Sequence, residues 1–456
     1  MPSGLRWLAP LALTFLVACG GDADDGRIEV DPPPAAPDAT PWSVVYGSIE
    51  NELRVPRLKV AVDGSGNVAL AGFAAGEIDF GGTKLASSPQ LAGFVVKFDP
   101  KGELVWSHVL TETRPYDVAF DGAGSVIVAG ALLGQTDFGG GSLAPADEAR
   151  LFLVKLDGDG KHLWSQRFGP SDEYPSAALT VKDGGEILLA ATMTGTADVG
   201  GGPLPASAEQ AILAQFSADG EHAWSRRLPN GFYVDGLTVD RTGHVLVSLG
   251  HMLLKLDAGG DTLWIREFDG ASGDTRSNRV ACDAEGNVLV TGMFTDTLRL
   301  GDLRLQAHAN PPLESGARDY EGFIAKLDPS GVPLWAERFG DGNFARGMAV
   351  AAVGDEIALA GTFNHVLDLG GRRAPGADCS TGFAYRLDAT GKARWGNAYI
   401  NNNALTCLVV EDMVMSGTTN PVMVGFFGGD VDFGAGRIST GLAGFGWSIF
   451  IAKLPR

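Results

Sequence analysis

One short segment recurs seven times along the chain, and this repetition limits the fold more than any other feature. Most copies place a lysine between apolar residues and end in aspartate. The copies occupy 96–99, 154–157, 214–217, 254–257, 325–328, 385–388 and 452–455. A glycine-containing turn and then a tryptophan follow each of the first six copies, whereas the seventh has none after it and an extra tryptophan stands early, at Trp42. Self-similarity at a regular spacing predicts one structural unit repeated seven times.

A second repeated segment supplies two more strands to each unit. Its clearest copy is Asp117–Asp121, a Gly-Ala-Gly turn, and then Ser125–Gly130. Short runs of β-branched and aliphatic residues between Asp and Gly turns are typical of strands, and no segment keeps a helical period. Four strands in each of seven units predict an all-β fold, a seven-bladed β-propeller of four-stranded blades. The tryptophans lie about 59 residues apart on average, which leaves room for an added loop in each blade.

The offset of the tryptophans predicts how the ring closes. We expect residues 450–454 to pair with residues 42–46, so that both chain ends build one blade and no sheet edge stays exposed. The tryptophan strand is then the outermost strand of each blade. The short Asp-Gly turns lie on one face, and the long connections, such as 131–150, lie on the other with the links between blades. We call the second face the loop face and expect function there, because loops on a rigid scaffold carry function.

Several segments of the repeat support a family resemblance. Residues 322–331 read Gly-Phe-Ile-Ala-Lys-Leu-Asp-Pro-Ser-Gly, and residues 283–292 read Asp-Ala-Glu-Gly-Asn-Val-Leu-Val-Thr-Gly. Asp-Phe-Gly-Gly follows the second strand at 79–82 and 137–140. These segments resemble the bacterial SBBP-type β-propeller repeat of secreted and lipidated envelope proteins. The resemblance covers about 42–456, implies an extracytoplasmic propeller, and supports the fold more than any function.

The first forty residues read as a targeting segment. One positive charge precedes an apolar run at 7–18 that is too short to span a bilayer. The run ends in Leu16-Val17-Ala18-Cys19, which resembles the lipobox of bacterial lipoproteins. That resemblance implies a signal peptide at 1–18 and a Cys19 that carries a diacylglycerol on its thiol and a fatty acyl chain on its amino group. Residues 19–41 would be an acidic, Pro-rich tether and 42–456 the propeller. The expected location is the cell envelope, at the outer membrane or the cell surface.

Charge and cysteine content exclude some partners. A formal net charge of -20 argues against nucleic acid, because phosphate binding needs clustered Lys and Arg. Besides Cys19 the chain has Cys282, Cys379 and Cys407, so one cysteine is left over and no disulfide framework is implied. A Cys379–Cys407 bond is one option that the sequence leaves open.

Catalytic and metal motifs are missing. We find no Gly-x-Ser-x-Gly elbow, phosphate loop or dinucleotide fingerprint, and the seven histidines are scattered. Asp and Gly are what hairpin turns require, so we interpret the Asp-x-x-Gly and Asp-Phe-Gly segments as structural turns. Calcium in the Asp-x-x-Gly turns is the alternative. We therefore expect no enzyme and no cofactor.

One irregularity in repeat length suggests a binding surface. The unit from Trp224 to Trp264 is about 40 residues long and the next about 71, because the first lacks its loop and the second carries an insertion at 299–320. The candidate ligand-binding residues of this insertion are Arg304, His308, Glu314, Arg318, Asp319 and Tyr320. A groove beside the missing loop is one hypothesis, and drift in surface loop length is the other.

The function that fits these features is a monomeric, envelope-anchored propeller that binds or scaffolds a protein or polysaccharide without catalysis. It would contact the membrane through its lipid anchor at Cys19. The alternatives are a propeller enzyme that acts on glycans or resembles quinoproteins, and an accessory of outer-membrane protein assembly. An enzyme predicts a cluster of acids and an arginine in the axial funnel of the ring.

Overall fold

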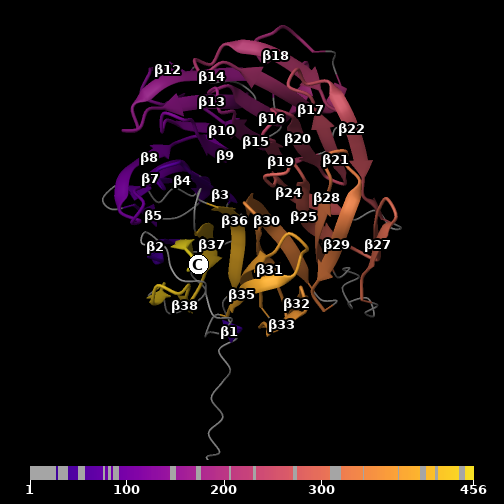
Figure 1. Cartoon of the computed structure of the whole chain (residues 1–456). Coiled ribbons are helices and arrows are strands. Elements are labelled where there is room, and N and C mark those ends of the chain that lie inside the picture. The colour runs from indigo at the N-terminus through magenta and orange to yellow at the C-terminus, as the bar shows by residue number, and fades with distance from the viewer. Residues whose placement is uncertain are drawn as a thin grey trace, which may run out of the picture.

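The chain forms a closed ring of seven blades around a central axis (Figure 1). The computed structural model describes residues 27–28, 40–49, 57–74, 78–80, 84–85, 92–143, 150–170, 176–204, 207–229, 233–270, 275–308, 320–341, 344–377, 379–400, 407–415, 420–440 and 447–455. This part of the chain contains strands and turns but no helix, and so no helical membrane span. The all-β, seven-bladed propeller expected from the repeats is thus confirmed. The signal peptide, most of the tether and the lipidation site Cys19 lie outside the described residues.

Six blades are each built from four antiparallel strands that follow one another from the axis outward. Blade A has β3 (Arg57–Val62), β4 (Val68–Ala74), β7 (Ala92–Phe98) and β8 (Leu104–Leu110). Blade B has β9 (Thr113–Phe120), β10 (Val126–Leu132), β13 (Arg150–Leu156) and β14 (His162–Pro170). Blade C has β15 (Ala177–Val181), β16 (Ile187–Gly195), β17 (Ser207–Phe216) and β18 (His222–Arg227). Blade D has β19 (Val234–Val239), β20 (Val245–Leu249), β21 (Met252–Leu256) and β22 (Thr262–Glu267). Blade E has β24 (Arg276–Cys282), β25 (Val288–Phe294), β28 (Glu321–Leu327) and β29 (Pro333–Phe339). Blade F has β30 (Ala345–Val353), β31 (Glu356–Phe363), β34 (Thr381–Leu387) and β35 (Ala393–Tyr399).

The seventh blade closes the ring from both chain ends, as expected. Blade G has β36 (Leu408–Met415), β37 (Pro421–Phe427), β40 (Trp447–Lys453) and, outermost, β2 (Trp42–Ile49). Trp42 pairs with Lys453 and Tyr46 with Ile449 in an antiparallel register. The tryptophan strand is outermost in every blade, so the predicted strand order is also correct.

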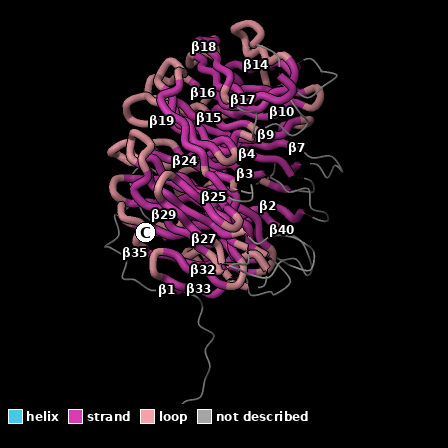
Figure 2. The backbone as a smooth tube through the Cα atoms, turned by 90° about the vertical axis from the view of Figure 1, so that its right-hand side faces the viewer, coloured by secondary structure: helices cyan, strands magenta, loops and turns pink. Residues whose placement is uncertain are grey.

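Short strands lie at the outer rim of the ring, beside the outer strands of the blades (Figure 1). Most are hairpins between the second and third strand of a blade: β5 (Ile78–Asp79) with β6 (Lys84–Leu85), β11 (Thr136–Asp137) with β12 (Ser142–Leu143), β32 (Val366–Leu369) with β33 (Arg372–Pro375), and β38 (Asp430–Asp432) with β39 (Arg437–Ser439). In blade E, β26 (Thr297–Leu300) lies between β27 (Leu303–Gln306) and β23 (Asp269–Gly270) and pairs with both. Figure 2 shows β27, β32 and β33 of blades E and F from the side. From the expected tether, β1 (Arg27–Ile28) pairs with the outer strand β35 of blade F.

The apolar core lies between neighbouring blades. One cluster joins Leu70 and Phe94 of blade A to Val424 and Ile451 of blade G, all fully buried. The second and third strands are covered on both faces by the adjacent blades, so β4, β10 and β37 are buried along their whole length. This explains why these strands read as continuous apolar runs instead of alternating with polar residues.

A repeated polar contact ties each blade to the next. In blade A the Lys97 ammonium and the Trp106 indole N–H both donate to the carbonyl of Gly158 in the outer turn of blade B, at 3.0 and 3.1 Å. Gly160 of that turn has φ 80° and packs under the Trp106 ring, where a Cβ would lie 2.8 Å from the ring. Equivalent indole donors are Trp42, Trp164, Trp264 and Trp335. These tryptophans therefore pack between neighbouring blades.

The boundary between blades F and G is built differently. The outer turn of blade G is replaced by the two chain ends, so Trp395 has no such turn to meet. A disulfide between Cys379, just before β34, and Cys407, just before β36, joins the two blades at this boundary, with the Cα atoms 5.2 Å apart. Cys282 is the cysteine left over, and burial raises the pKa of its thiol to about 12.

Candidate functional site

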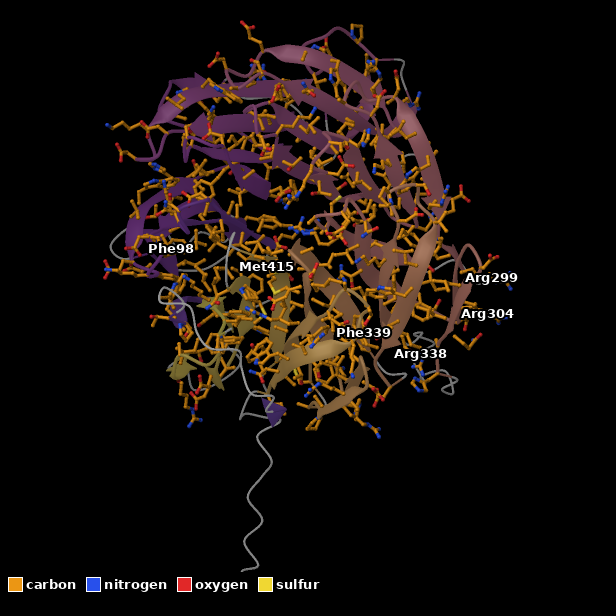
Figure 3. The ribbon with its side chains drawn as sticks, in the orientation of Figure 1. Phe98, Arg299, Arg304, Arg338, Phe339 and Met415 are labelled. Atoms are coloured by element: carbon orange, nitrogen blue, oxygen red, sulfur yellow. A yellow bond between two sulfur atoms is a disulfide. The ribbon has the colours of Figure 1, made fainter. Side chains whose placement is uncertain are left out.

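The candidate residues of the blade E insertion are only partly within the described residues. Glu314, Arg318 and Asp319 lie outside them. Arg304 lies on β27 at the outer rim, where it is exposed and bonds Gln306 (Figure 3). The structure therefore places Arg304 on the side of the ring away from the axis.

The other two candidates lie beside the strands of blades E and F. Tyr320 is half-buried, forms a parallel bridge with Phe344, and accepts a hydrogen bond from the amide of Ala345. His308 lies within reach of Glu321, the first residue of β28. His308 also lines a pocket.

His308 belongs to a charged cluster around a buried carboxylate. The Glu321 side chain is 1% exposed and receives the backbone amide and Nδ1 of His308 at 2.8 and 2.6 Å. Its other oxygen accepts a bond from Arg338 Nη1 at 2.9 Å. A buried carboxylate needs such partners, so His308 and Arg338 are held in fixed positions.

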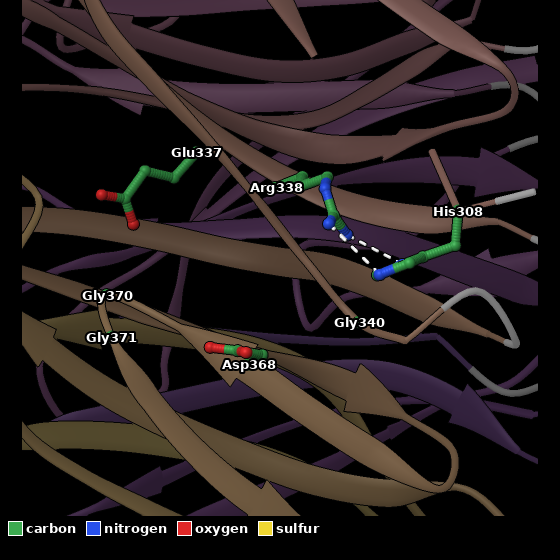
Figure 4. Close-up of a pocket in the computed structure, with 7 residues that line it drawn as sticks. All are labelled: His308, Glu337, Arg338, Gly340, Asp368, Gly370 and Gly371. Carbon is green, nitrogen blue, oxygen red and sulfur yellow. Dashed lines mark hydrogen bonds between the residues drawn. The ribbon is translucent and has the colours of Figure 1, made fainter. Parts of the chain in front are cut away.

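A polar pocket lies next to this cluster, between the outer strand β29 of blade E and the β32–β33 hairpin of blade F (Figure 4). Its volume is about 340 Å³. The lining residues are His308, Glu337, Arg338, Gly340, Asp368, Gly370 and Gly371. The volume is that of a small-ligand site.

The pocket presents acceptors on one side and donors on the other. Glu337 and the exposed Asp368 supply carboxylates and Arg338 supplies N–H groups, while the two ring nitrogens of His308 lie 2.8 and 3.2 Å from the Arg338 guanidinium (Figure 4). Burial raises the pKa of Glu337, a backbone hydrogen bond from Gly370 lowers it, and the Asp368 charge raises it further. Fixed carboxylates facing N–H donors can bind a hydroxyl-rich molecule, since each hydroxyl both donates and accepts.

The missing loop of blade D lies on the other side of the insertion. Leu249 pairs directly with Met252, and the amide of Gly250 donates to Asp235 on the inner strand β19. The blade E hairpin is anchored next to it through β23. The pocket described above lies toward blade F instead, so the groove beside blade D stays a prediction.

The axis holds a second group of charged side chains, which we call the axial layer: Lys59, Asp117, Arg279 and Asp412. Each pairs with the residue just before a glycine of the second strand, namely Ala71, Ala129, Thr291 and Val424. They therefore share one level of the ring. Blade F has only Ala349 at this level, which leaves room for a long side chain to cross.

Asp412 is the centre of the axial layer. Its side chain is fully buried, and both oxygens bond the Arg279 guanidinium, which comes from blade E across blade F. The Lys59 ammonium lies 3.9 Å away and the amide of Val60 donates at 3.4 Å. Burial raises the pKa of Asp412, but Arg279 and Lys59 outweigh it and hold the pKa below its ordinary value.

Asp117 has the opposite balance. Its carboxylate accepts the amides of Leu179 at 2.8 Å and Val118 at 3.0 Å. Burial raises its pKa more than the charges of Arg279 and Lys59 lower it. Acids and an arginine thus meet at the axis, which is the feature expected of an enzyme. Both aspartates already accept hydrogen bonds from neighbouring protein groups, and these bonds hold the two carboxylates in place.

The axial layer was not predicted from the sequence, although a signal for it was present. The first strand of a blade is an apolar run, and a charged residue at the same position in four of seven copies breaks that pattern. Counting back four residues from the turn that follows the first strand gives Lys59 before Asp63, Asp117 before Asp121 and Arg279 before Asp283, and Asp412 stands at the same distance before Ser416. The bulges in β9, β24 and β36 lie on the N-terminal side of these residues and do not shift this count.

The Asp-Gly turns behave as the structural interpretation predicts. Asp137 Oδ1 accepts the amides of Gly139 and Gly141 at 2.7 and 3.0 Å, and Asp121 Oδ1 accepts those of Ala123 and Ser125. In the part of the chain that the structure describes, no three His, Cys, Asp or Glu side chains are grouped so as to hold a metal ion.

Comparison with known proteins gives limited matches. No family model matches the chain. A WD repeat-containing protein of Acanthamoeba polyphaga mimivirus, itself uncharacterized, is 23% identical over 137 residues, 30% of this chain, which spans 9% of that protein's length. A D-aminoacyl-tRNA deacylase of Dinoroseobacter shibae is 36% identical over 136 residues, 27% of this chain and 84% of that protein. A protein of that size is shorter than three blades of this ring. The match therefore covers only a part of the propeller.

Solved structures of low identity align over most of the ring. A streptogramin B lyase covers 91% of this chain and 98% of its own at 10% identity, with a TM-score of 0.44. The Pan2 WD40 domain of Neurospora crassa covers 92% and 97% at 11% identity, with a TM-score of 0.45. The fold rests on the strand pairing of the chain itself.

Proposed function

We propose that this propeller is a non-catalytic binding module, anchored to the cell envelope through Cys19, that binds a hydroxyl-rich ligand such as a glycan between blades E and F. The observation that carries the proposal is the polar pocket, with two carboxylates opposite a guanidinium and an imidazole. The charge pairing around Glu321 supports it, because a site fixed before the ligand arrives loses little entropy on binding.

The site can be tested by substitutions that spare the buried cluster. Asp368→Asn and Glu337→Gln remove pocket charge without leaving Glu321 unpaired, and Asp261→Asn on the opposite face, where the side chain is 79% exposed, is the matched control. We expect the full chain to bind a member of a panel of bacterial polysaccharides, and the two pocket variants, but not the control, to weaken that binding about tenfold. Unchanged binding by both pocket variants contradicts the site.

The anchor can be tested separately. We expect radiolabelled palmitate to be incorporated into the wild-type chain in its host and Cys19→Ala to abolish both labelling and recovery in the membrane fraction. Labelling of the Cys19→Ala chain contradicts the lipoprotein interpretation. Affinity capture from cross-linked cells with the same two chains tests the alternative of an accessory to outer-membrane protein assembly, which requires barrel proteins among the captured partners.

A second candidate function is a glycan-acting enzyme, favoured by the meeting of Asp117, Asp412 and Arg279 at the axis. It requires turnover of a glycoside that Asp117→Asn abolishes while the fold is kept. Binding without turnover across the same polysaccharide panel favours the binding module.

A further inference from the structure

Four arginines occupy one level of the ring, closer to the loop face than the axial layer. We call them the arginine layer: Arg57, Arg114, Arg276 and Arg346. Each pairs with the residue just after a glycine of the second strand, namely Phe73, Ala131, Met293 and Thr362. All four stand at the beginning of an inner strand, where the chain enters the blade from the loop face.

Three of these arginines, Arg57, Arg276 and Arg346, interact electrostatically with one another and with nearby carboxylates. Arg276 of blade E bonds Asp235 of blade D at 3.0 Å. Burial lowers the pKa of Arg346, the Glu411 charge raises it, and the charges of Arg276 and Arg57 lower it again. Because Arg57 belongs to blade A and Arg346 to blade F, with blade G between them, the layer is a set of charges around one end of the axis.

Within the described part of the chain, positive charge exceeds negative charge at this end. The arginine layer brings four guanidinium groups, and the described carboxylates that interact with it are Asp235 and Glu411. Burial raises the pKa of Glu411 to about 7, while Arg346, Lys59 and Arg57 lower it and Asp412 raises it, so Glu411 is partly neutral near pH 7. The whole chain carries a net charge of -20, so an excess of positive charge at one spot is unusual in it.

Solvent reaches this end of the axis. Arg57 is exposed, and 34% of the Arg276 side chain is accessible. The Tyr233 ring is 54% exposed and lies 5.4 Å from the Arg276 guanidinium. The apolar face of a sugar, or another flat apolar group, can pack on an accessible aromatic ring, and a guanidinium beside that ring can hydrogen-bond an anionic group of the same ligand.

We propose that the arginine layer is a second binding site, separate from the pocket between blades E and F, and that it takes a ligand bearing a carboxylate. Arg57 and Arg276 would bind the carboxylate through charge-assisted hydrogen bonds, and Tyr233 would contact the body of the ligand. Glu411 opposes the ligand charge when it is ionised, so the site binds best where Glu411 is protonated. An acidic sugar and a small organic acid share this chemistry.

The test is calorimetric titration of the full chain in detergent at pH 6 with glucuronate, succinate and glucose. We expect glucuronate to bind and glucose not to compete with it. Arg57→Gln should weaken glucuronate binding roughly tenfold, because one charge-assisted contact is lost. Arg241→Gln, which removes an exposed arginine on the opposite face, is the matched control. Succinate that binds as well as glucuronate identifies an organic-acid site, and weaker succinate an acidic-sugar site.

A second variant keeps the proposal testable if Arg57→Gln fails to fold. Glu411→Gln removes the opposing charge and should tighten glucuronate binding at pH 8 while changing it little at pH 5. Absence of carboxylate binding, equal affinity for glucose, or an equal effect of Arg57→Gln and Arg241→Gln would overturn the proposal. Because the pocket variants are read out separately on polysaccharide, this failure and that of the proposed function can be told apart.

Discussion

Replacing Lys255 by methionine tests the contact that joins neighbouring blades. Lys255 lies in β21 of blade D with its side chain 4% exposed. Its ammonium is 2.9 Å from Asp240 Oδ2, in the inner turn of the same blade, and 3.2 Å from the carbonyl of Pro329 in blade E. Methionine is of similar length and removes the charge alone. The carbonyl keeps a donor in Trp264, but Asp240 becomes a buried carboxylate without its cation.

The size of the effect follows from the titration of Asp240. Burial raises its pKa, but hydrogen bonds from Thr242, Lys255 and the amide of His244 outweigh burial and lower the pKa from 3.8 to about 2. A depressed pKa stabilises the fold above pH 3.8 and loses that contribution as the pH falls through about 2. A pKa lowered from 3.8 to about 2 corresponds to about 2 kcal/mol. Breaking a buried pair on one side costs about 3 kcal/mol or more, so Lys255→Met should lower the free energy of unfolding by about 3 kcal/mol at pH 7.

Urea denaturation followed by tryptophan fluorescence measures this change at several pH values. The difference between wild type and Lys255→Met should shrink as the pH falls from 4 toward 2, because Asp240 then becomes neutral in both. Lys161→Met, in an exposed outer turn, is the matched control and should change stability by less than about 0.5 kcal/mol. A Lys255→Met chain that matches this control at pH 7, or a difference that does not depend on pH, would refute the reasoning.

Three further predictions concern closure, the disulfide and the axis. Deleting 450–456 removes the strand between β37 and β2, so the ring should unfold or oligomerise; a monomer on size exclusion that melts like the parent contradicts this. Cys379→Ser opens a loop with a sequence separation of 28 and should cost about 3–4 kcal/mol, seen as a lower Tm that reductant does not lower further. Glu411 has a pKa raised to about 7, so its contribution is complete below pH 4.5 and is lost as the pH rises through 7. Glu411→Gln should therefore raise the Tm at pH 8 and leave it nearly unchanged at pH 4, and equal shifts at both pH values would contradict the role of burial.

The fold could be predicted because its causes are local and repeated. Most turns of the blades are marked in the sequence by Asp and Gly, and six of the seven outer strands carry a tryptophan that packs on the glycine of the next turn, as Trp106 packs on Gly160. Seven copies of a weak pattern make a strong one. Closure could be predicted from the position of Trp42. The last repeat lacks its outer tryptophan strand, so the N-terminal segment that contains Trp42 must supply it.

The binding surfaces could not be predicted in the same way, because they depend on residues that the repeat does not contain. His308 was singled out for its place in a long insertion, but its partner Glu321 is the first residue of a core strand and its pocket borders Asp368 of another blade. Loop length along the sequence says nothing about which neighbouring blade a loop will face.

The axis shows the same limit more sharply. A ring brings the inner strands of non-adjacent blades face to face, so Arg279 meets Asp412, 133 residues away, across a blade that contributes only an alanine. A small apolar residue is the ordinary occupant of this inner-strand position, as at Ala178 of blade C. Where a blade has a charged residue there instead, the ring brings that side chain close to the charged side chains of the other blades. The charged residues that replace apolar ones on the inner strands are therefore informative about function when they are considered together. In this chain they form two levels: lysine, arginine and aspartate in the axial layer, and four arginines nearer the loop face, where the described residues carry more positive charge than negative.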